Sequence, residues 1–292
     1  RISGRGVTIA RPFDRRKGNK GNFMITSASN MQIKKVQQIL KKARTRREEG
    51  VFAAEGAKMF REAPKDRLRK IFVSQAFALS REGKELLAEK GLDTESSPLV
   101  EIVEDRIFKS LSDTVTPQGI LFLVEIKTSG LEEMTEGGKP PLLMILEDLQ
   151  DPGNLGTIVR TGEGAGVTGV ILSKNSVDIY NPKVIRSTMG SIYRMPVLYT
   201  DSIEEEILPV LKEKGIRTFA AHLQGKNFYD REDYREGTAF FIGNEGNGLS
   251  RELTAKADVL IKIPMEGQVE SLNAAMASGI LMYETLRQRR LG

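Results

Sequence analysis

The stretch Thr238-Ala-Phe-Phe-Ile-Gly-Asn-Glu-Gly-Asn-Gly-Leu249 decides the fold of the C-terminal half of the chain. Its apolar run does not alternate with polar residues, which is typical of a strand covered on both faces in a parallel sheet. Gly243, Gly246 and Gly248 then end the strand, and Ser250 is a suitable N-cap for a following helix. The stretch therefore predicts a strand, a glycine-rich loop and a helix.

A second stretch, Val259-Leu-Ile-Lys-Ile-Pro-Met-Glu-Gly-Gln-Val-Glu-Ser-Leu-Asn273, has the same organisation. Its strand stops at Pro264, and Ser271 is predicted to cap the final helix. Loops that leave the same end of adjacent parallel strands form a crevice, which is the usual ligand site of an open α/β sheet. Glu245, Ser271 and Asn273 are therefore candidate site residues, although a structural turn and an ordinary N-cap would give the same pattern.

The third stretch runs from Leu142 to Arg160 and again contains an apolar strand, a Pro-Gly turn and the start of a helix. Asn154 is predicted to cap this helix. Arg160 lies six residues further on, between one and two helical turns away. We expect its long side chain to reach back toward the same crevice.

Together the three stretches resemble the SpoU family of RNA ribose methyltransferases, within the SPOUT superfamily. The matching residues are Asn154, Gly156 and Arg160, then Gly243, Glu245, Gly246, Gly248 and Leu249, and finally Ile263-Pro264-Met265 and Ser271-Leu272-Asn273. Members of the family often have a β-branched or hydroxyl residue directly after the last motif, where this chain has Ala274-Ala275-Met276. That difference bears on helix packing more than on chemistry.

The resemblance implies methyl transfer from S-adenosylmethionine to a ribose 2′-hydroxyl of RNA, with ribosomal RNA favoured over transfer RNA and no metal ion required. The catalytic residues that it implies are Arg160, Asn154, Glu245, Ser271 and Asn273. The cofactor-binding residues that it implies are Gly243, Ile263, Pro264, Met265, Leu272 and Asn273. Because arginine is almost never neutral in proteins, we expect Arg160 to orient and stabilise the 2′-alkoxide or an adjacent phosphate.

The resemblance also bears on fold and assembly. It implies an α/β protein with a C-terminal parallel-sheet SPOUT domain, a trefoil knot in that domain, and a smaller N-terminal α/β RNA-binding domain. It implies a homodimer formed through the C-terminal domain. The last helix is the candidate interface because Ala274, Ala275, Ala277 and Gly279 allow close approach, although packing within one chain would use the same residues.

The distribution of charge indicates where a polyanion would dock. The formal net charge is +5, but residues 1–24 carry seven Lys and Arg against one Asp, and residues 25–130 carry nineteen against fifteen acidic residues. Residues 131–292 carry eighteen basic residues against twenty-three acidic ones. We therefore expect RNA to bind the N-terminal half.

Composition and element patterning predict four segments. Residues 1–24 lack apolar periodicity and are expected to form a basic disordered arm, or else an extension introduced at the start of the chain. Residues 25–128 are expected to form the small α/β domain, residues 129–141 a linker rich in Gly and Pro, and residues 142–292 the methyltransferase domain.

The small domain begins with a helix whose basic face is the candidate RNA contact. The segment from Arg46 to Gly56 also resembles the start of the substrate-binding domain that many SpoU proteins carry. A charge run is often only a solvated face, which is the alternative here. The candidate RNA-binding residues are Lys34, Lys35, Lys41, Lys42, Arg44, Arg46 and Arg47.

Composition excludes several classes of site. The chain has no cysteine and a single histidine, His222, so disulfides, thiolate metal sites and multi-histidine metal sites are not available. His222 ends an apolar run and is predicted to have a structural role at the end of a strand. No run approaches the roughly 18 apolar residues of a membrane span, and no secretory signal is evident, so we expect a soluble cytoplasmic protein with no membrane partner.

One glycine motif is misleading. Residues 164–169 match the G-x-G-x-x-G letters of dinucleotide-binding proteins, but they are predicted to follow a helix and precede a strand, which is the reverse of the required order. We interpret them as a helix terminus. Two alternatives to the methyltransferase interpretation remain, a non-catalytic RNA-binding protein on the same fold and a nucleotide-cofactor enzyme on a doubly wound sheet.

Overall fold

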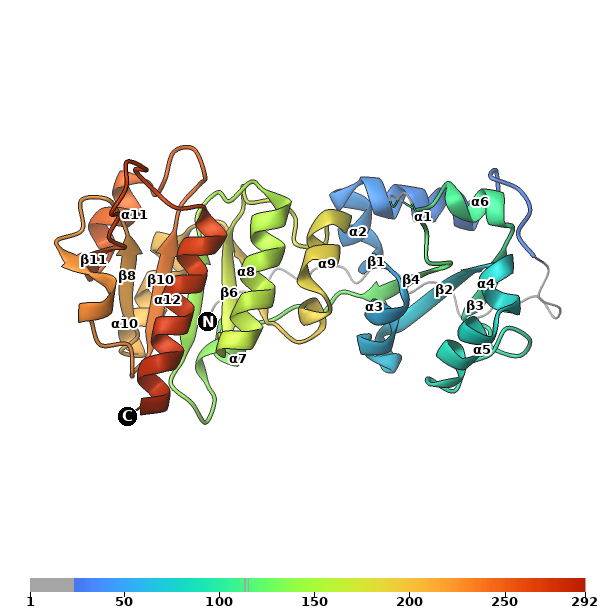
Figure 1. The fold of residues 1–292 in the computed structure, drawn as a ribbon, viewed down its shortest axis with the longest axis horizontal. Coiled ribbons are helices and arrows are strands. Elements are labelled where there is room, and N and C mark those ends of the chain that lie inside the picture. The colour runs from blue at the N-terminus through green and yellow to red at the C-terminus, as the bar shows by residue number, and fades with distance from the viewer. Residues whose placement is uncertain (1–23, 113, 115, 292) are drawn as a thin grey trace. The chain divides into compact units, whose positions relative to one another are not determined.

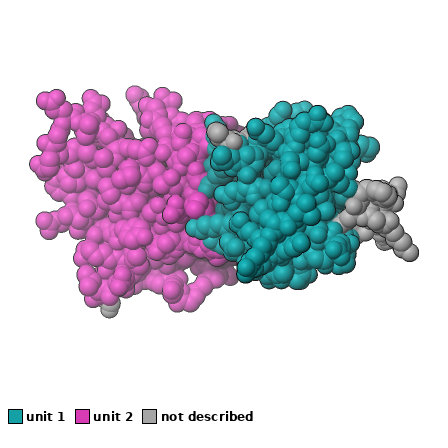
Figure 2. Space-filling model, turned by 45° about the vertical axis from the view of Figure 1, so that its right-hand side comes forward, with its two compact units in different colours: residues 1–127, 180–186 teal, residues 128–179, 187–292 magenta. Residues whose placement is uncertain are grey.

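The computed structural model describes residues 24–112, 114 and 116–291. The chain divides into two compact units, coloured separately in Figure 2. Unit 1 comprises the chain up to Lys127 together with residues 180–186, and unit 2 comprises residues 128–179 and 187–292. All but the last residue of the predicted basic arm lies outside the described residues.

Unit 1 is built on a four-stranded sheet of order β1-β4-β2-β3. Strand β4 is antiparallel to both β1 and β2, whereas β3 is parallel to β2. The strands are β1 (Val51–Glu55), β2 (Leu68–Ser74), β3 (Val100–Val103) and β4 (Ile120–Glu125). The helices are α1 (Met31–Lys41), α2 (Ala43–Glu49), α3 (Ala57–Glu62), α4 (Gln75–Leu79), α5 (Arg81–Ala88) and α6 (Asp105–Lys109), with a 3-10 turn at Lys65–Arg67.

The basic N-terminal helix is interrupted rather than continuous. The Asn30 side chain accepts a hydrogen bond from the Gln32 backbone N–H at 2.8 Å and caps α1. Lys42 then adopts an extended conformation, with φ −123° and ψ 117°, between α1 and α2. The Arg46 guanidinium donates to the carbonyls of Ile39 and Leu40, at 2.6 and 3.1 Å, and thereby satisfies acceptors at the end of α1.

This junction changes one sequence prediction. The Arg46 residue is only 4% exposed, so it is part of the helix junction and is not available as the predicted RNA contact. The other six basic side chains of the predicted set lie at the surface or are half-buried. Two of these take part in ion pairs, Lys35 with Glu49 and Arg44 with Glu48, both at 2.6 Å.

Unit 2 is built on a seven-stranded sheet of order β7-β6-β5-β10-β8-β11-β9, and every pairing in it is parallel. This confirms the predicted parallel sheet; the trefoil knot stays a prediction. The strands are β5 (Leu142–Leu146), β6 (Gly169–Ser173), β7 (Val197–Thr200), β8 (Arg217–Ala221), β9 (Asn227–Phe228), β10 (Thr238–Ile242) and β11 (Val259–Lys262). The short edge strand β9 has no counterpart in the sequence prediction.

Helices cover both faces of this sheet. Leu131 and Met134 of α7 share a buried cluster with Leu211 and Leu253 from the helices of the same face, so the predicted linker contains a helix packed on unit 2. On the other face α8 and α12 lie side by side (Figure 1). The helices are α7 (Leu131–Thr135), α8 (Pro152–Ala165), α10 (Leu208–Glu213), α11 (Arg251–Lys256) and α12 (Ala274–Leu291), with a π-helical turn at Ile203–Ile207 and 3-10 turns at Ser191–Tyr193 and Tyr229–Arg231. Helix α9 (Pro182–Thr188) falls mostly in the segment that belongs to unit 1.

No helix among the residues that the structure describes is long and apolar enough to cross a membrane.

The ends of the helices correct some predictions and confirm others. The side chain of Asp151, rather than that of Asn154, caps α8, because it accepts from the Asn154 backbone N–H at 2.7 Å. Ser250 caps α11 as predicted. The misleading glycine motif is a helix terminus as predicted: α8 ends at Ala165, and Gly166 adopts a left-handed φ of 82°.

We predict that Arg46→Ala destabilises unit 1 by roughly 1–3 kcal/mol, because the carbonyls of Ile39 and Leu40 lose their charged donor. Thermal unfolding of the full chain measures the effect as a lower midpoint. Arg47→Ala is the matched control, since Arg47 is exposed on the same helix and its loss should change stability by no more than about 0.5 kcal/mol. Equal midpoints for the two variants would contradict the role given to Arg46.

Candidate functional site

A chain of three side chains joins the three motifs that the sequence singles out. The Asn154 amide N–H donates to the Glu245 carboxylate at 3.0 Å. The Asn273 amide N–H donates in turn to the Asn154 side-chain oxygen at 2.9 Å. Because Asn154 donates on one side and accepts on the other, both ends of its amide are satisfied and its orientation is fixed. Asn154 is 91 positions from Glu245 and 119 positions from Asn273 in the sequence, so only the tertiary fold brings these residues together.

Glu245 is tied to the start of α8 by further hydrogen bonds. Its carboxylate accepts from the backbone N–H groups of Gln150 and Asp151, at 3.0 and 2.9 Å. Free N–H groups and the helix dipole favour a negative charge at this end of a helix. Partial burial opposes ionisation of Glu245, but the hydrogen bonds from Asn154, Gln150 and Asp151 outweigh it and lower its pKa. The carboxylate is therefore ionised at neutral pH and holds two loops together.

Asn273 has a second role at the start of α12. Its side-chain oxygen accepts from the backbone N–H groups of Ala275 and Met276, at 2.9 and 3.3 Å. Asn273 therefore caps the final helix, and the cap predicted for Ser271 is wrong. The Asn273 side chain thus has two functions. Its oxygen fixes where α12 begins, and its amide N–H group, bound to Asn154, fixes the distance between α12 and α8.

The glycine-rich loop after β10 folds back on itself. Asn244 and Gly248 exchange two backbone hydrogen bonds, at 3.1 and 2.9 Å, and the Asn244 side chain accepts from the N–H groups of Gly246 and Asn247. A Cβ atom on Gly243 would lie 2.1 Å from the carbonyl carbon of Gly248. Gly243 is therefore required by the close approach of its own loop.

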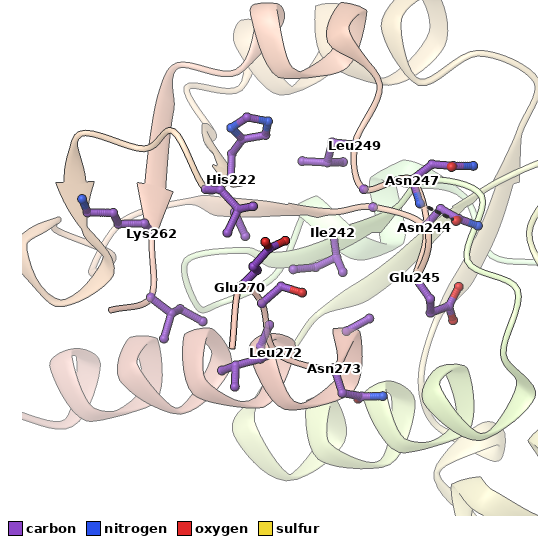
Figure 3. A pocket seen from close by; sticks show the side chains of 18 of the residues that line it. His222, Ile242, Asn244, Glu245, Asn247, Leu249, Lys262, Glu270, Leu272 and Asn273 are labelled. Atoms are coloured by element: carbon purple, nitrogen blue, oxygen red, sulfur yellow. Dashed lines mark hydrogen bonds between the residues drawn. The ribbon is translucent and has the colours of Figure 1, made fainter. Parts of the chain in front are cut away.

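A cavity of about 580 Å³ lies beside this loop, at the carboxyl ends of β8, β10 and β11 and at the start of α12. Figure 3 shows its lining side chains. Apolar side chains form much of the wall, among them Ile242, Leu249, Ile261, Ile263 and Leu272. A crevice at the carboxyl ends of parallel strands is the usual ligand site of an open α/β sheet. An apolar wall that carries a few polar groups is typical of pockets for small molecules.

The structure brings together most of the predicted site residues, but not all. Glu245, Ser271 and Asn273 line the cavity, as do the predicted cofactor residues Gly243, Ile263, Met265 and Leu272. Pro264 and Asn154 are not part of the lining, and Asn154 acts through its two hydrogen bonds.

Arg160 also lies outside the lining, and it is exposed on α8. Six residues of α-helix amount to about 9 Å of rise and about 240° of rotation. Arg160 therefore points to a different side of α8 from the buried Asn154.

Several residues that line the cavity were not predicted as site residues, among them His222, Asn244 and Glu270. His222 directly follows β8, and its Nδ1 atom accepts from the Gln224 backbone N–H at 3.2 Å, which fits the predicted structural role although the residue also lines the cavity. Asn244 shapes the glycine loop. Glu270 precedes the Ser-Leu-Asn motif and points toward the strand ends (Figure 3). The position of His222 at a strand end was a usable signal, because strand ends of a parallel sheet meet at one edge.

Comparison with known proteins identifies both halves of the chain. Residues 141–283 match the model of the SpoU rRNA Methylase family, and residues 30–121 match that of the MRM3-like substrate binding domain. A relative from Bacillus subtilis (strain 168), named 23S rRNA (guanosine(2553)-2′-O)-methyltransferase RlmP, is 30% identical over 89% of this chain and 97% of its own length.

Solved structures agree over nearly the whole chain. An AdoMet-bound rRNA methyltransferase from Sinorhizobium meliloti is 28% identical, with a TM-score of 0.76, and the match covers 91% of this chain and 97% of that one. The SpoU methyltransferase AviRb from Streptomyces viridochromogenes, in complex with AdoMet, is 25% identical, with a TM-score of 0.77. This match covers 90% of this chain and 100% of that one.

We predict that Asn154→Asp destabilises unit 2 by roughly 1–3 kcal/mol, because it removes a donor and sets a second carboxylate against Glu245. Repulsion raises the pKa of the pair in the folded state. Because the pKa of the pair is raised in the folded state, the variant loses stability as pH rises. The difference in free energy of unfolding between wild type and variant should therefore be largest near neutral pH and should shrink below about pH 4.

Urea unfolding of the wild type and the variant at several pH values measures this deficit. Asn247→Asp is the matched control, because it adds the same charge in the neighbouring loop without breaking the chain of hydrogen bonds. A deficit that does not change with pH, or one that the control shares, would contradict the pairing of Asn154 with Glu245.

Proposed function

This chain belongs to the SpoU rRNA Methylase family, and we propose that its substrate is ribosomal RNA rather than transfer RNA. Its activity is the transfer of a methyl group from S-adenosylmethionine to a ribose 2′-hydroxyl of RNA. The observation that supports this cavity as the cofactor site is the set of hydrogen bonds by which Glu245, Asn154 and Asn273 hold three segments beside it. The match to a 23S rRNA methyltransferase along nearly its whole length supports ribosomal RNA.

The cavity suits S-adenosylmethionine in size and chemistry. Its volume of about 580 Å³ falls within the roughly 300–1,000 Å³ of small-molecule sites. The backbone at Gly243 and the side chains of Ile263, Met265 and Leu272 would hold the adenosine, with apolar walls against the base. Ser271 and Asn273 would hold polar groups at the start of α12. S-adenosylmethionine supplies a methyl group activated by the adjoining sulfonium.

The protein has to position the ribose and stabilise the oxyanion that forms as the hydroxyl proton leaves. Arg160 is the proposed group for this task, since a guanidinium stays charged and offers several donors. Asn154, Glu245 and Asn273 would act by fixing the positions of the three loops relative to one another. The catalytic roles that we propose for Glu245 and Asn154 are thus positioning roles.

We propose that Arg160 acts in a homodimer and serves the cavity of the partner copy. Its side chain is exposed on a face of α8 that turns away from Asn154. On the adjoining helix α12, Met276 and Tyr283 are 61% and 52% exposed and lie seven residues apart, two turns along one helix face. Gly279 approaches Thr161 of α8 within the same chain, so we place the proposed interface on the exposed apolar side chains of α12.

We propose that RNA docks on unit 1 through the exposed part of its basic helices. Lys34, Lys41, Lys42 and Arg47 are exposed and project from α1, from α2 or from the break between them. Lys35 and Arg44 share their charge with neighbouring carboxylates and contribute less. Binding through such cations weakens steeply as salt rises. We also propose a cytoplasmic location, where this substrate is found.

We predict that wild-type protein transfers labelled methyl groups from S-adenosylmethionine to ribosomal RNA, and that Arg160→Ala lowers the rate roughly 10²- to 10³-fold through loss of one preorganised donor. Scintillation counting of ribosomal and transfer RNA after incubation measures the rate. Ribose methylation is then assigned by mass spectrometry of the nucleosides.

Arg251→Ala is the matched control, because it removes an exposed arginine at the start of α11 that we give no role. Methylation of transfer RNA alone would overturn the proposed substrate. Near-normal turnover by Arg160→Ala would remove that residue from the mechanism. RNA binding without any methyl transfer would favour the non-catalytic alternative.

We predict a dimer by light scattering at micromolar concentration, and a monomer after Tyr283→Glu because a charge would be buried in the interface. Leu79→Glu on α4, also an exposed apolar position, should leave the dimer intact. Co-expression of Arg160→Ala with Asn273→Ser should restore about a quarter of wild-type activity, because half of the dimers would then hold one complete site. A wild-type monomer, or no recovery on co-expression, would contradict the proposal.

A further inference from the structure

We propose that the Glu270 carboxylate binds the cationic part of S-adenosylmethionine and so selects the charged cofactor over neutral adenosine compounds. The inference rests on the proposed cofactor site. It concerns a side chain that the three sequence motifs leave out. Glu270 precedes Ser271 at the start of the last motif and lines the cavity.

The charged groups of the cavity make Glu270 distinctive. Within the described residues the lining contains four ionisable side chains, those of His222, Glu245, Lys262 and Glu270. The Glu245 carboxylate is engaged by Asn154 and by two backbone N–H groups. The Lys262 ammonium lies over the Phe228 ring, 4.9 Å from its centroid, and His222 Nδ1 is engaged by Gln224.

Glu270 has no comparable commitment. In the part of the chain that the structure describes it makes no hydrogen bond or ion pair. Figure 3 shows its carboxylate pointing into the cavity, toward the ends of the strands near His222 and Ile242, whereas the Glu245 carboxylate is turned away from it. Apolar side chains such as Ile242 and Leu272 form part of the surrounding wall, and a ligand that fills the cavity removes water from this carboxylate. An ionised carboxylate that loses water requires a positive partner.

The cofactor carries two such partners. S-adenosylmethionine has a sulfonium and an ammonium group, its demethylated product has the ammonium alone, and methylthioadenosine has neither. A charge-assisted contact is among the stronger polar contacts available in a protein site. If Glu270 faces the sulfonium, the contact weakens when the methyl group leaves, and the product is released more readily. If it faces the ammonium, the contact is the same before and after transfer.

The experiment is calorimetric titration of three ligands into wild-type protein and into Glu270→Gln, a change that removes charge with little change in shape. We expect the variant to bind S-adenosylmethionine roughly tenfold more weakly, the loss expected for one contact to a charged group, and to bind methylthioadenosine unchanged. Glu266→Gln is the matched control, because Glu266 is exposed on the same loop and is not part of the lining. Glu270→Asp should recover part of the affinity.

Each outcome decides the proposal. A loss confined to S-adenosylmethionine, or shared by it and its demethylated product, supports the contact and assigns it to the sulfonium or to the ammonium. An equal loss for methylthioadenosine, or no loss for any ligand, overturns it. Unchanged thermal midpoints of the unliganded variants separate binding from folding. Failure of the wild type to bind S-adenosylmethionine would instead refute the proposed cofactor site, so the two failures are distinguishable.

Discussion

The hydrogen bonds that join Glu245, Asn154 and Asn273 are the constraint on which the site depends. Each of these residues stands at the start of a helix or in a loop, where backbone geometry alone would leave considerable freedom. Glu245 ties its loop to the two backbone N–H groups that directly precede α8, and Asn273 both caps α12 and binds Asn154. The spacing of three loops is thus fixed by side chains that need not touch a substrate themselves.

The order of strands explains why these loops meet. Strand β10 lies between β5 and β8 in the sheet, so the loops after β5 and β10 leave the same edge from neighbouring strands. Helices α8 and α12 then pack side by side on one face and bring Asn154 and Asn273 within reach. The cavity lining contains both polar and apolar side chains, which suits a ligand with an aromatic base and a charged tail.

Charge is divided between the two units according to task. Unit 1 exposes most of its helical cations, but it uses Arg46 to satisfy carbonyls where α1 breaks, which shows that a basic run can contain a structural member. Unit 2 keeps its carboxylates at the cavity in two different states. Glu245 is fully engaged by hydrogen bonds, and Glu270 points into the cavity. Two acidic residues at one cavity therefore serve different purposes, one in holding loops together and one, as proposed, in binding.

The sequence by itself determined the parallel sheet, the cap at Ser250 and the three motifs of the family, because apolar runs, glycines and capping residues act over a few positions. It could not determine that Asp151 rather than Asn154 caps α8, since either side chain can accept a hydrogen bond from a backbone N–H group at the helix start. Nor could it determine that the basic helix breaks at Lys42. Only the tertiary structure decided that Arg160 lies outside the lining of the cavity and that Glu270 points into it. Those directions depend on how helices and loops distant in sequence pack against one sheet, which no local pattern encodes.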